Sequence, residues 1–242
     1  MIMIARISFL FFSMQKDIQF LNQKYQFHLR DEADESVCNE IFKLKEYRIA
    51  DEAISNAKDP IIDVGAHAGF FTMYARALNP KIKIFAIEPE LKNIEAFNAH
   101  IAINKISGVK LIAGALAGET GERKLAVSSD SHNHKLIDEF ERDGESAKVH
   151  VFSFQDFCTQ NKIKKISLMK LDIEGGEYEV FEAMSETDLA IVNYIVLEYH
   201  MGREKSREIE EKLRENGFAV QIFPSKYDKT MGFIFGHNKR FL

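Results

Sequence analysis

The stretch that decides the fold is residues 61–70, which read Ile-Ile-Asp-Val-Gly-Ala-His-Ala-Gly-Phe. It begins as a short apolar run, typical of a strand buried on both faces, and ends in small turn residues. A helix is expected directly afterwards, over residues 70–78, because the apolar pattern there ends at Asn79-Pro80. This order of strand, turn and helix is the unit from which parallel sheets are built.

The same alternation continues along most of the chain. Further strands are expected at residues 81–88, 109–113, 166–172 and 194–198. Further helices are expected at residues 91–103 and 203–216, and one that follows Glu177 and ends at about residue 184. Alternation at this spacing predicts an α/β fold with a doubly wound, mostly parallel sheet. Two late strands, 218–223 and 231–235, are close enough to form a hairpin, which predicts one antiparallel strand at the end of the sheet.

One segment departs from the alternation. Residues 122–127 and 148–154 are expected to pair as an antiparallel excursion around a polar loop, residues 128–147. A loop of this length inside a compact domain is typically a lid, a binding loop or a disordered segment.

Composition narrows the classes of function. The chain has 242 residues, with 32 Lys plus Arg against 37 Asp plus Glu, which gives a formal net charge of −5. Net acidity argues against nonspecific nucleic-acid binding, which needs clustered positive charge. The two cysteines, Cys38 and Cys158, lie far apart and favour neither a disulfide framework nor a zinc site. A reducing, cytoplasmic location is therefore expected.

Residues 1–58 are expected to form an N-terminal accessory segment, with residues 59–242 forming the main domain. The apolar run 1–12 is interrupted by Arg6 and is shorter than the roughly 20 apolar residues that a membrane span requires. We interpret it as a docking strand or helix and expect no membrane span. The apolar positions between Glu40 and Ala57 fit a helix better than a strand.

The turn after the first strand is expected to border a ligand, because ligands of open parallel sheets bind outside the carboxyl ends of the strands. Gly65 removes a side chain where a ligand would approach the backbone, and Gly69 lets the helix pack closely as it begins. The dinucleotide fingerprint G-x-G-x-x-G fails here, since His67 and Phe70 replace its second and third glycines. The carboxylate of Asp63 beside this turn favours a ligand with a cationic group.

Glu88 ends the second strand, directly before Pro89. An acidic side chain at this position can accept hydrogen bonds from both hydroxyls of a ribose. The alternative is a solvated strand end. The glycine turn that precedes Glu88 by one helix favours the ribose interpretation.

Four motifs in this order resemble the FkbM family of S-adenosylmethionine-dependent methyltransferases. They are residues 63–72, Glu88-Pro89, residues 170–177 (Lys-Leu-Asp-Ile-Glu-Gly-Gly-Glu) and residues 196–200 (Val-Leu-Glu-Tyr-His). The resemblance covers roughly residues 38–236, and it departs at His67, where the family has Asn, and at Gly176, where Ala is frequent. It implies a seven-stranded Rossmann-like methyltransferase sheet with an antiparallel terminal strand.

The resemblance also implies S-adenosyl-L-methionine as the cofactor and a set of residues that bind it. These are Asp63, Gly65, Ala66, Gly69, Glu88 and Ala115. Asp63 would lie near the methionine end, often through water to its ammonium group, with the backbone of Gly65 and Ala66 close by. Glu88 would hold the ribose, and Ala115 would border the adenine.

Candidates for catalysis follow the two later strands. Asp172 and Glu174 are two residues apart, so an extended chain would turn both to one face. His200 is the best general base by type, since its unperturbed pKa is about 6.5. Its plainer interpretation is a histidine bonded to the backbone. These three residues could ligate a divalent cation together with Glu198, but no spacing demands it and we expect no metal.

The leading hypothesis is methyl transfer from S-adenosylmethionine to a hydroxyl oxygen of a small molecule, such as a sugar, with a nitrogen acceptor as the less favoured alternative. His200 or Asp172 would take the proton, and the loop 128–147 would help to exclude water. The acceptor rests on analogy with the family. Two alternatives stay open, an NAD(P)-dependent oxidoreductase on a similar sheet and a cofactor-binding module without catalysis. No nucleic-acid partner is expected, and a homo-oligomer is compatible with the sequence.

Overall fold

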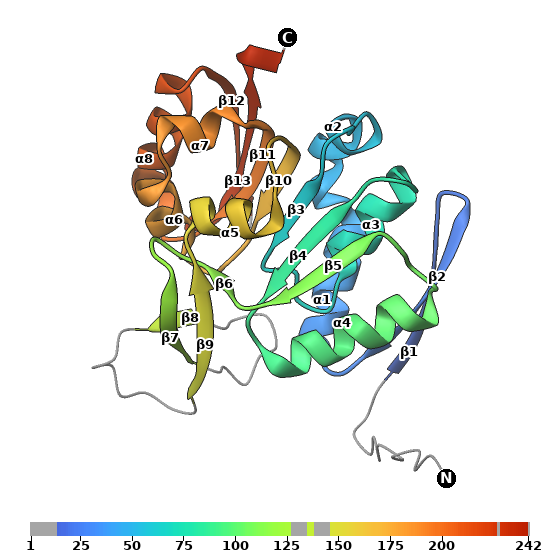
Figure 1. The fold of residues 1–242 in the computed structure, drawn as a ribbon. Helices are drawn as coiled ribbons and strands as arrows, with labels where there is room; N and C mark the ends of the chain where they lie inside the picture. Colours follow the sequence, from blue (N-terminus) through green and yellow to red (C-terminus); the bar gives the residue numbers. More distant parts are fainter. Residues whose placement is uncertain (1–13, 127–134, 138–145, 227, 242) are drawn as a thin grey trace.

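A seven-stranded central sheet organises the protein, in the order β12-β13-β11-β10-β3-β4-β5. The computed structural model describes residues 14–126, 135–137, 146–226 and 228–241 (Figure 1). The strands of the sheet are β3 (Ile61–Val64), β4 (Ile84–Glu88), β5 (Val109–Ala113), β10 (Ile166–Leu171), β11 (Val192–Tyr199), β12 (Phe218–Pro224) and β13 (Gly232–Asn238). The helices around it are α3 (Phe70–Leu78), α4 (Leu91–Ile103), α5 (Phe154–Asn161), α6 (Glu177–Ala183), α7 (Glu186–Ala190) and α8 (Gly202–Glu215).

Every neighbouring pair from β11 through β10, β3 and β4 to β5 is parallel. Only β13 runs the other way, because it pairs antiparallel with both β11 and β12. The predicted fold class, a mostly parallel Rossmann-like sheet with an antiparallel terminal strand, is therefore confirmed. The strand order reverses between β3 and β10, so a ligand-binding crevice is expected at the carboxyl ends of these two strands.

Two hydrophobic layers cover the two faces of the sheet. One layer packs Val64 and Leu171 of the strands with residues of α5, α6 and α8, such as Phe181 and Leu213. The other layer packs strand residues such as Leu168 with α3 and with the N-terminal segment. The alternating strands therefore bury both faces, as their near-continuous apolar sequences require.

The described part of the N-terminal segment starts with a hairpin that the sequence pattern did not predict. Its elements are β1 (Met14–Phe20), β2 (Gln23–Leu29), α1 (Glu32–Asn39), a π-helical turn (Glu40–Leu44), a 3-10 turn (Glu46–Ala50) and α2 (Asp51–Ser55). The single helix expected between residues 40 and 57 is broken at Lys45, whose φ of 54° lies in the left-handed region. Phe20 stacks on Tyr74 of α3, so this segment shares the core of the sheet. The apolar run 1–12 lies outside the described residues.

The expected antiparallel excursion is also present. β7 (Gly121–Ala126) pairs antiparallel with β9 (Ser146–Phe152), and β6 (Ala115–Leu116) and β8 (Lys135–Ile137) complete a small second sheet. The rest of the polar loop 128–147 lies largely outside the described residues. None of the helices in the described part of the chain has the length and apolar character needed to cross a bilayer.

Candidate active site

A cavity of about 1330 Å³ opens at the carboxyl ends of β3, β4, β10 and β11, where the strand order predicts it. The part beside β3 and β4, here called the glycine-turn half, is lined by Gly65, Ala66, His67, Glu88, Pro89 and Ala115. The part beside β10 and β11, here called the acidic half, is lined by Glu46, Tyr47, Lys170, Asp172, Glu174 and Glu198. One cavity therefore contains both the first and the third sequence motif.

The glycine turn is fixed by its neighbours in the sheet. The amides of Gly65 and Ala66 both donate to the carbonyl of Ile87, at 3.1 and 3.0 Å. Gly65 has a φ of 75°, and a Cβ there would lie 1.9 Å from the carbonyl oxygen of Asp172. The close approach that requires this glycine is thus made by the protein's own backbone, whereas the sequence suggested a ligand. Gly69, with a φ of 88°, leaves room for the ring of Phe97 as α3 begins.

Glu88 is buried at the end of β4, with only 4% of its surface exposed. Its Oε2 accepts from the amide of His67 at 2.8 Å, and its Oε1 accepts from the amide of Glu90 and from Asn93 Nδ2. Burial raises the pKa of this carboxyl group against these hydrogen bonds. Since a carboxylate oxygen has two acceptor positions, Oε2 keeps one for a ligand hydroxyl. The alternative of a solvated strand end is therefore wrong.

Asp63 is completely buried and is not among the residues that line the cavity. Thr72 Oγ1 donates to its Oδ2 at 2.7 Å, and Lys170 Nζ lies 3.5 Å from its Oδ1. Burial raises the pKa of this carboxyl group, against the opposing effect of Lys170. The cation that Asp63 meets in this structure is a lysine of the protein, and its place near the methionine end of the cofactor stays a prediction.

Lys170 joins the first and third motifs, and sequence reasoning assigned it no role. It lies on β10 with 3% of its surface exposed, and its Nζ donates to the carbonyl of Gly65 at 2.7 Å. Nζ also lies 3.6 Å from Asp172 Oδ2. Burial lowers the pKa of Lys170, but the charges of Asp172 and Asp63 outweigh it and raise the pKa overall. A lysine within an apolar strand needs such partners, and this was the available signal.

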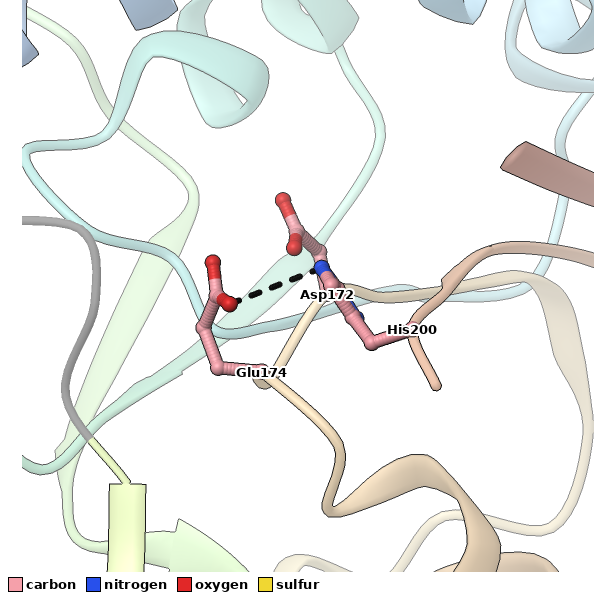
Figure 2. A group of neighbouring side chains, drawn as sticks. All are labelled: Asp172, Glu174 and His200. Atoms are coloured by element: carbon pink, nitrogen blue, oxygen red, sulfur yellow. Dashed lines mark ion pairs between the residues drawn. The ribbon is translucent and has the colours of Figure 1, made fainter. Parts of the chain in front are cut away.

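Asp172, Glu174 and His200 come together beyond the ends of β10 and β11 (Figure 2). Their ligand atoms all lie within 4.8 Å of one another. The extended chain that was expected to align the two carboxylates is not present, because Glu174 has a φ of 54°. A left-handed turn, followed by Gly175, brings Glu174 back toward His200 instead. The predicted grouping is observed, but its predicted cause is wrong.

The surroundings of His200 do not suit it to act as a general base. Its Nδ1 lies 3.2 Å from Oε1 of the buried Glu177, and its Nε2 lies 3.6 Å from Oε2 of Glu174. Burial disfavours the charged ring, but the hydrogen bond and charge of Glu177, with the charges of Glu174 and Asp172, outweigh it and raise the pKa of His200 to about 9. In the metal-free protein this pKa favours a protonated imidazole at neutral pH, which counts against a general base here, and the catalytic role of His200 stays a prediction.

The N-terminal segment supplies residues that sequence reasoning did not place in the site. Tyr47 donates a hydrogen bond through its hydroxyl to Asp172 Oδ2 at 3.2 Å. Burial raises the pKa of Tyr47 well above its usual value, so the hydroxyl keeps its proton. Because 125 residues separate the two partners, no local motif could show this contact.

Glu46 gives a pH-dependent test of this packing. Burial and then the charges of Glu40 and Asp172 raise its pKa to about 7. Because an unfolded Glu has a pKa of about 4.3, wild type loses stability relative to Glu46→Gln as the pH rises from about 4.3 to 7. We expect the variant's advantage in free energy of unfolding to grow by up to about 1 kcal/mol, discounted because Glu46 is only half-buried. Urea titrations at pH 4.5 and 8 measure it, and a constant difference would contradict the assignment.

Comparison with known proteins identifies the family. The family model described as "Methyltransferase FkbM domain" matches residues 63–220. The chain belongs to this family. It is an S-adenosylmethionine-dependent methyltransferase, as the resemblance of the four motifs implied. The alternative of an NAD(P)-dependent oxidoreductase is not favoured by this family membership.

Named relatives share this domain at low identity. Methyltransferase sdnD of Sordaria araneosa is 26% identical over 190 residues, covering 66% of this chain and 73% of the relative. The 31-O-demethyl-FK506 methyltransferase FkbM of Streptomyces tacrolimicus is 23% identical, in an alignment that covers 67% of this chain and 73% of the relative. The hexuronic acid methyltransferase AglP of Haloferax volcanii is 21% identical, in an alignment that covers 83% of this chain and 82% of the relative.

Solved structures show the same fold at still lower identity. The fibrillarin pre-rRNA processing protein of Methanococcus jannaschii superposes with a TM-score of 0.51 at 13% identity, covering 93% of this chain and 83% of that chain. An rRNA methylase from Streptococcus thermophilus superposes with a TM-score of 0.51 at 7% identity, covering 80% of this chain and 96% of that chain. These similarities concern the fold alone.

Proposed function

We propose that this FkbM-family enzyme methylates a hydroxyl oxygen of a small, oxygen-rich acceptor such as a sugar. The observation that carries the proposal is that Asp172, Glu174 and Glu198 line the same cavity as the glycine turn. Carboxylates accept hydrogen bonds from hydroxyl groups, so this half of the cavity suits a molecule with several hydroxyls. The relatives named for a hexuronic acid and for an O-demethyl substrate support the same class of acceptor.

The glycine-turn half fits the nucleoside of the cofactor. Glu88 keeps an acceptor position on Oε2 for the ribose, and it lines the cavity together with Gly65 and Ala66. Ala115 lines the same half and would border the adenine. S-adenosylmethionine supplies a methyl group on a positively charged sulfur, and its transfer leaves a neutral thioether.

The acidic half would orient the acceptor and take its proton. We assign the proton to Asp172, because its carboxylate lines the cavity and is held in place by Tyr47 and Lys170. In the balanced reaction, the acceptor's O–H bond and the sulfur–methyl bond break, an oxygen–methyl bond forms, and Asp172 takes the proton. Alignment of the hydroxyl is the main contribution of the protein, since the methyl donor is already activated.

Glu88→Ala is expected to weaken binding of S-adenosylmethionine by about 1.5–3 kcal/mol, or roughly tenfold to a hundredfold in Kd, through loss of charge-assisted hydrogen bonds. Isothermal titration calorimetry measures the affinity, and thermal unfolding checks that the variant is folded. Glu95→Ala, on the exposed face of α4, is the matched control. An unchanged Kd in the folded Glu88 variant would contradict the ribose assignment.

The acceptor class is tested by incubating the purified protein with S-adenosylmethionine and a panel of sugars, uronic acids, polyols and amines. Release of the demethylated cofactor identifies acceptors, and NMR spectroscopy of the products locates the new methyl group. We expect turnover with at least one hydroxyl acceptor and an O-methyl product. Turnover with amines alone, or none in a protein that binds the cofactor, would contradict the proposal.

A further inference from the structure

We propose that Asp172, Glu174 and His200 bind a divalent transition-metal ion, such as Mn²⁺, at the edge of the acidic half of the cavity, which Asp172 and Glu174 line. Each residue offers one ligand atom, and the three atoms lie within 4.8 Å of one another (Figure 2). Metal–oxygen and metal–nitrogen bonds of about 2.0–2.2 Å would bring these atoms slightly closer together around one ion. One imidazole and two carboxylates form a donor set of the kind that first-row divalent metals accept.

His200 gives the observation that points to a ligand beyond the cluster of acids. It has 9% of its surface exposed, and its Nε2 is buried with no hydrogen-bond partner among the described residues. Figure 2 shows this nitrogen directed at the carboxylate of Glu174, 3.6 Å away, too far for a hydrogen bond. A buried ring nitrogen without a partner costs free energy. A metal ion that displaces the proton from Nε2 and binds between Nε2 and Glu174 would satisfy both groups, with the proton released to solvent.

The other nitrogen of His200 is held as metal-binding histidines usually are. Its Nδ1 lies 3.2 Å from Oε1 of Glu177, a carboxylate that is fully buried. Both oxygens of Glu177 are also fixed, since they accept from the amides of Ile173 and Gly175 at 2.9 Å. A carboxylate on the far nitrogen fixes the ring orientation and makes the near nitrogen a better ligand.

Asp172 keeps an oxygen for the ion. Tyr47 and Lys170 both contact it through Oδ2, at 3.2 and 3.6 Å. Its Oδ1 has no hydrogen-bond partner among the described residues and remains available. Glu174 is partly exposed and lines the cavity with Asp172, so an ion can enter from the cavity and water can complete its coordination.

This site deepens the proposed function and rests on it for its role. An ion at Asp172 and Glu174 would sit where the acceptor hydroxyl is proposed to bind. Coordination of the hydroxyl oxygen would lower its pKa and fix its direction, so that its proton leaves more easily to Oδ2 of Asp172 while Oδ1 ligates the ion.

The test is a titration of the full-length protein, treated with a chelator and then freed of it, with Mn²⁺ followed by electron paramagnetic resonance. The signal of free Mn²⁺ falls as the ion binds. We expect one bound ion in the wild type and at least about tenfold weaker binding in Glu174→Gln and in His200→Gln, the size of change that altered metal shells produce. Glu95→Gln, which also removes one carboxylate, should bind as the wild type does.

The absence of bound Mn²⁺ in the wild type, or unchanged affinity in either folded site variant, would overturn the proposal. Circular dichroism confirms the fold of each variant, and Glu174→Gln is at a partly exposed position where misfolding is not expected. Because the titration contains neither cofactor nor acceptor, a negative result leaves the proposed hydroxyl methylation standing. Failure of the acceptor panel likewise leaves the metal result unaffected.

Discussion

Asp172→Asn is expected to lower kcat by about 10²–10⁴-fold, the usual contribution of a positioned acid or base. The amide keeps the size of the carboxylate and can still accept from Tyr47 at its oxygen. It cannot take the hydroxyl proton at neutral pH. Cofactor affinity should remain close to that of the wild type, because Asp172 lies in the acidic half of the cavity and the ribose is assigned to Glu88.

Single-turnover kinetics with a saturating acceptor measure the chemical step directly. Calorimetric titration of the same variant with S-adenosylmethionine separates binding from catalysis. Asp17→Asn, an exposed position on the N-terminal hairpin, is the matched control and should show wild-type kcat. A full rate in Asp172→Asn would show that another group takes the proton.

Lys170→Met should lower the free energy of unfolding by about 3–5 kcal/mol, as removal of one partner from a buried ion pair does. Methionine has nearly the same shape, so the loss is one of charge and hydrogen bonds. Asp63 would be left completely buried without its cation, and the carbonyl of Gly65 would lose its donor. The glycine turn should then be less well fixed, and cofactor affinity should fall as well.

Guanidinium chloride titrations of the wild type, Lys170→Met and the exposed control Lys81→Met measure this effect. Adding Asp63→Asn to Lys170→Met should recover part of the loss, because the uncompensated charge is then removed. A loss below about 1 kcal/mol in Lys170→Met, the range of surface substitutions, would contradict the role of this buried cation.

Much of the fold could be predicted because its signals are local. The helices 70–78 and 91–103 have the predicted bounds, since turn residues and prolines limit both of them. The N-terminal hairpin was missed, although its second strand has the alternation of a strand: residues 25, 27 and 29 are buried and the residues between them are more exposed. Besides pairing with β1, its second strand packs on α3 and α4, as in the contacts of Phe27 with Phe70 and His100, and local propensity does not show such contacts.

In the candidate site too, the features that depend on local motifs could be predicted, and those that depend on contacts between distant segments could not. The positions of Glu88 and of the Asp172–Glu174 pair at strand ends follow from the order of motifs. The contribution of Tyr47 and the true partner of Asp63 depend on contacts across the sheet. The raised pKa of His200 could not be predicted for the same reason, because it depends on Glu177 and Glu174, whose distances to the ring depend on a left-handed turn.

A crystal structure of the protein with S-adenosylmethionine tests the central claim most directly. We predict a ribose hydroxyl at hydrogen-bonding distance from Oε2 of Glu88, with the methyl group directed toward Asp172 and Glu174. A cofactor bound elsewhere, or a ribose that does not contact Glu88, would contradict the account.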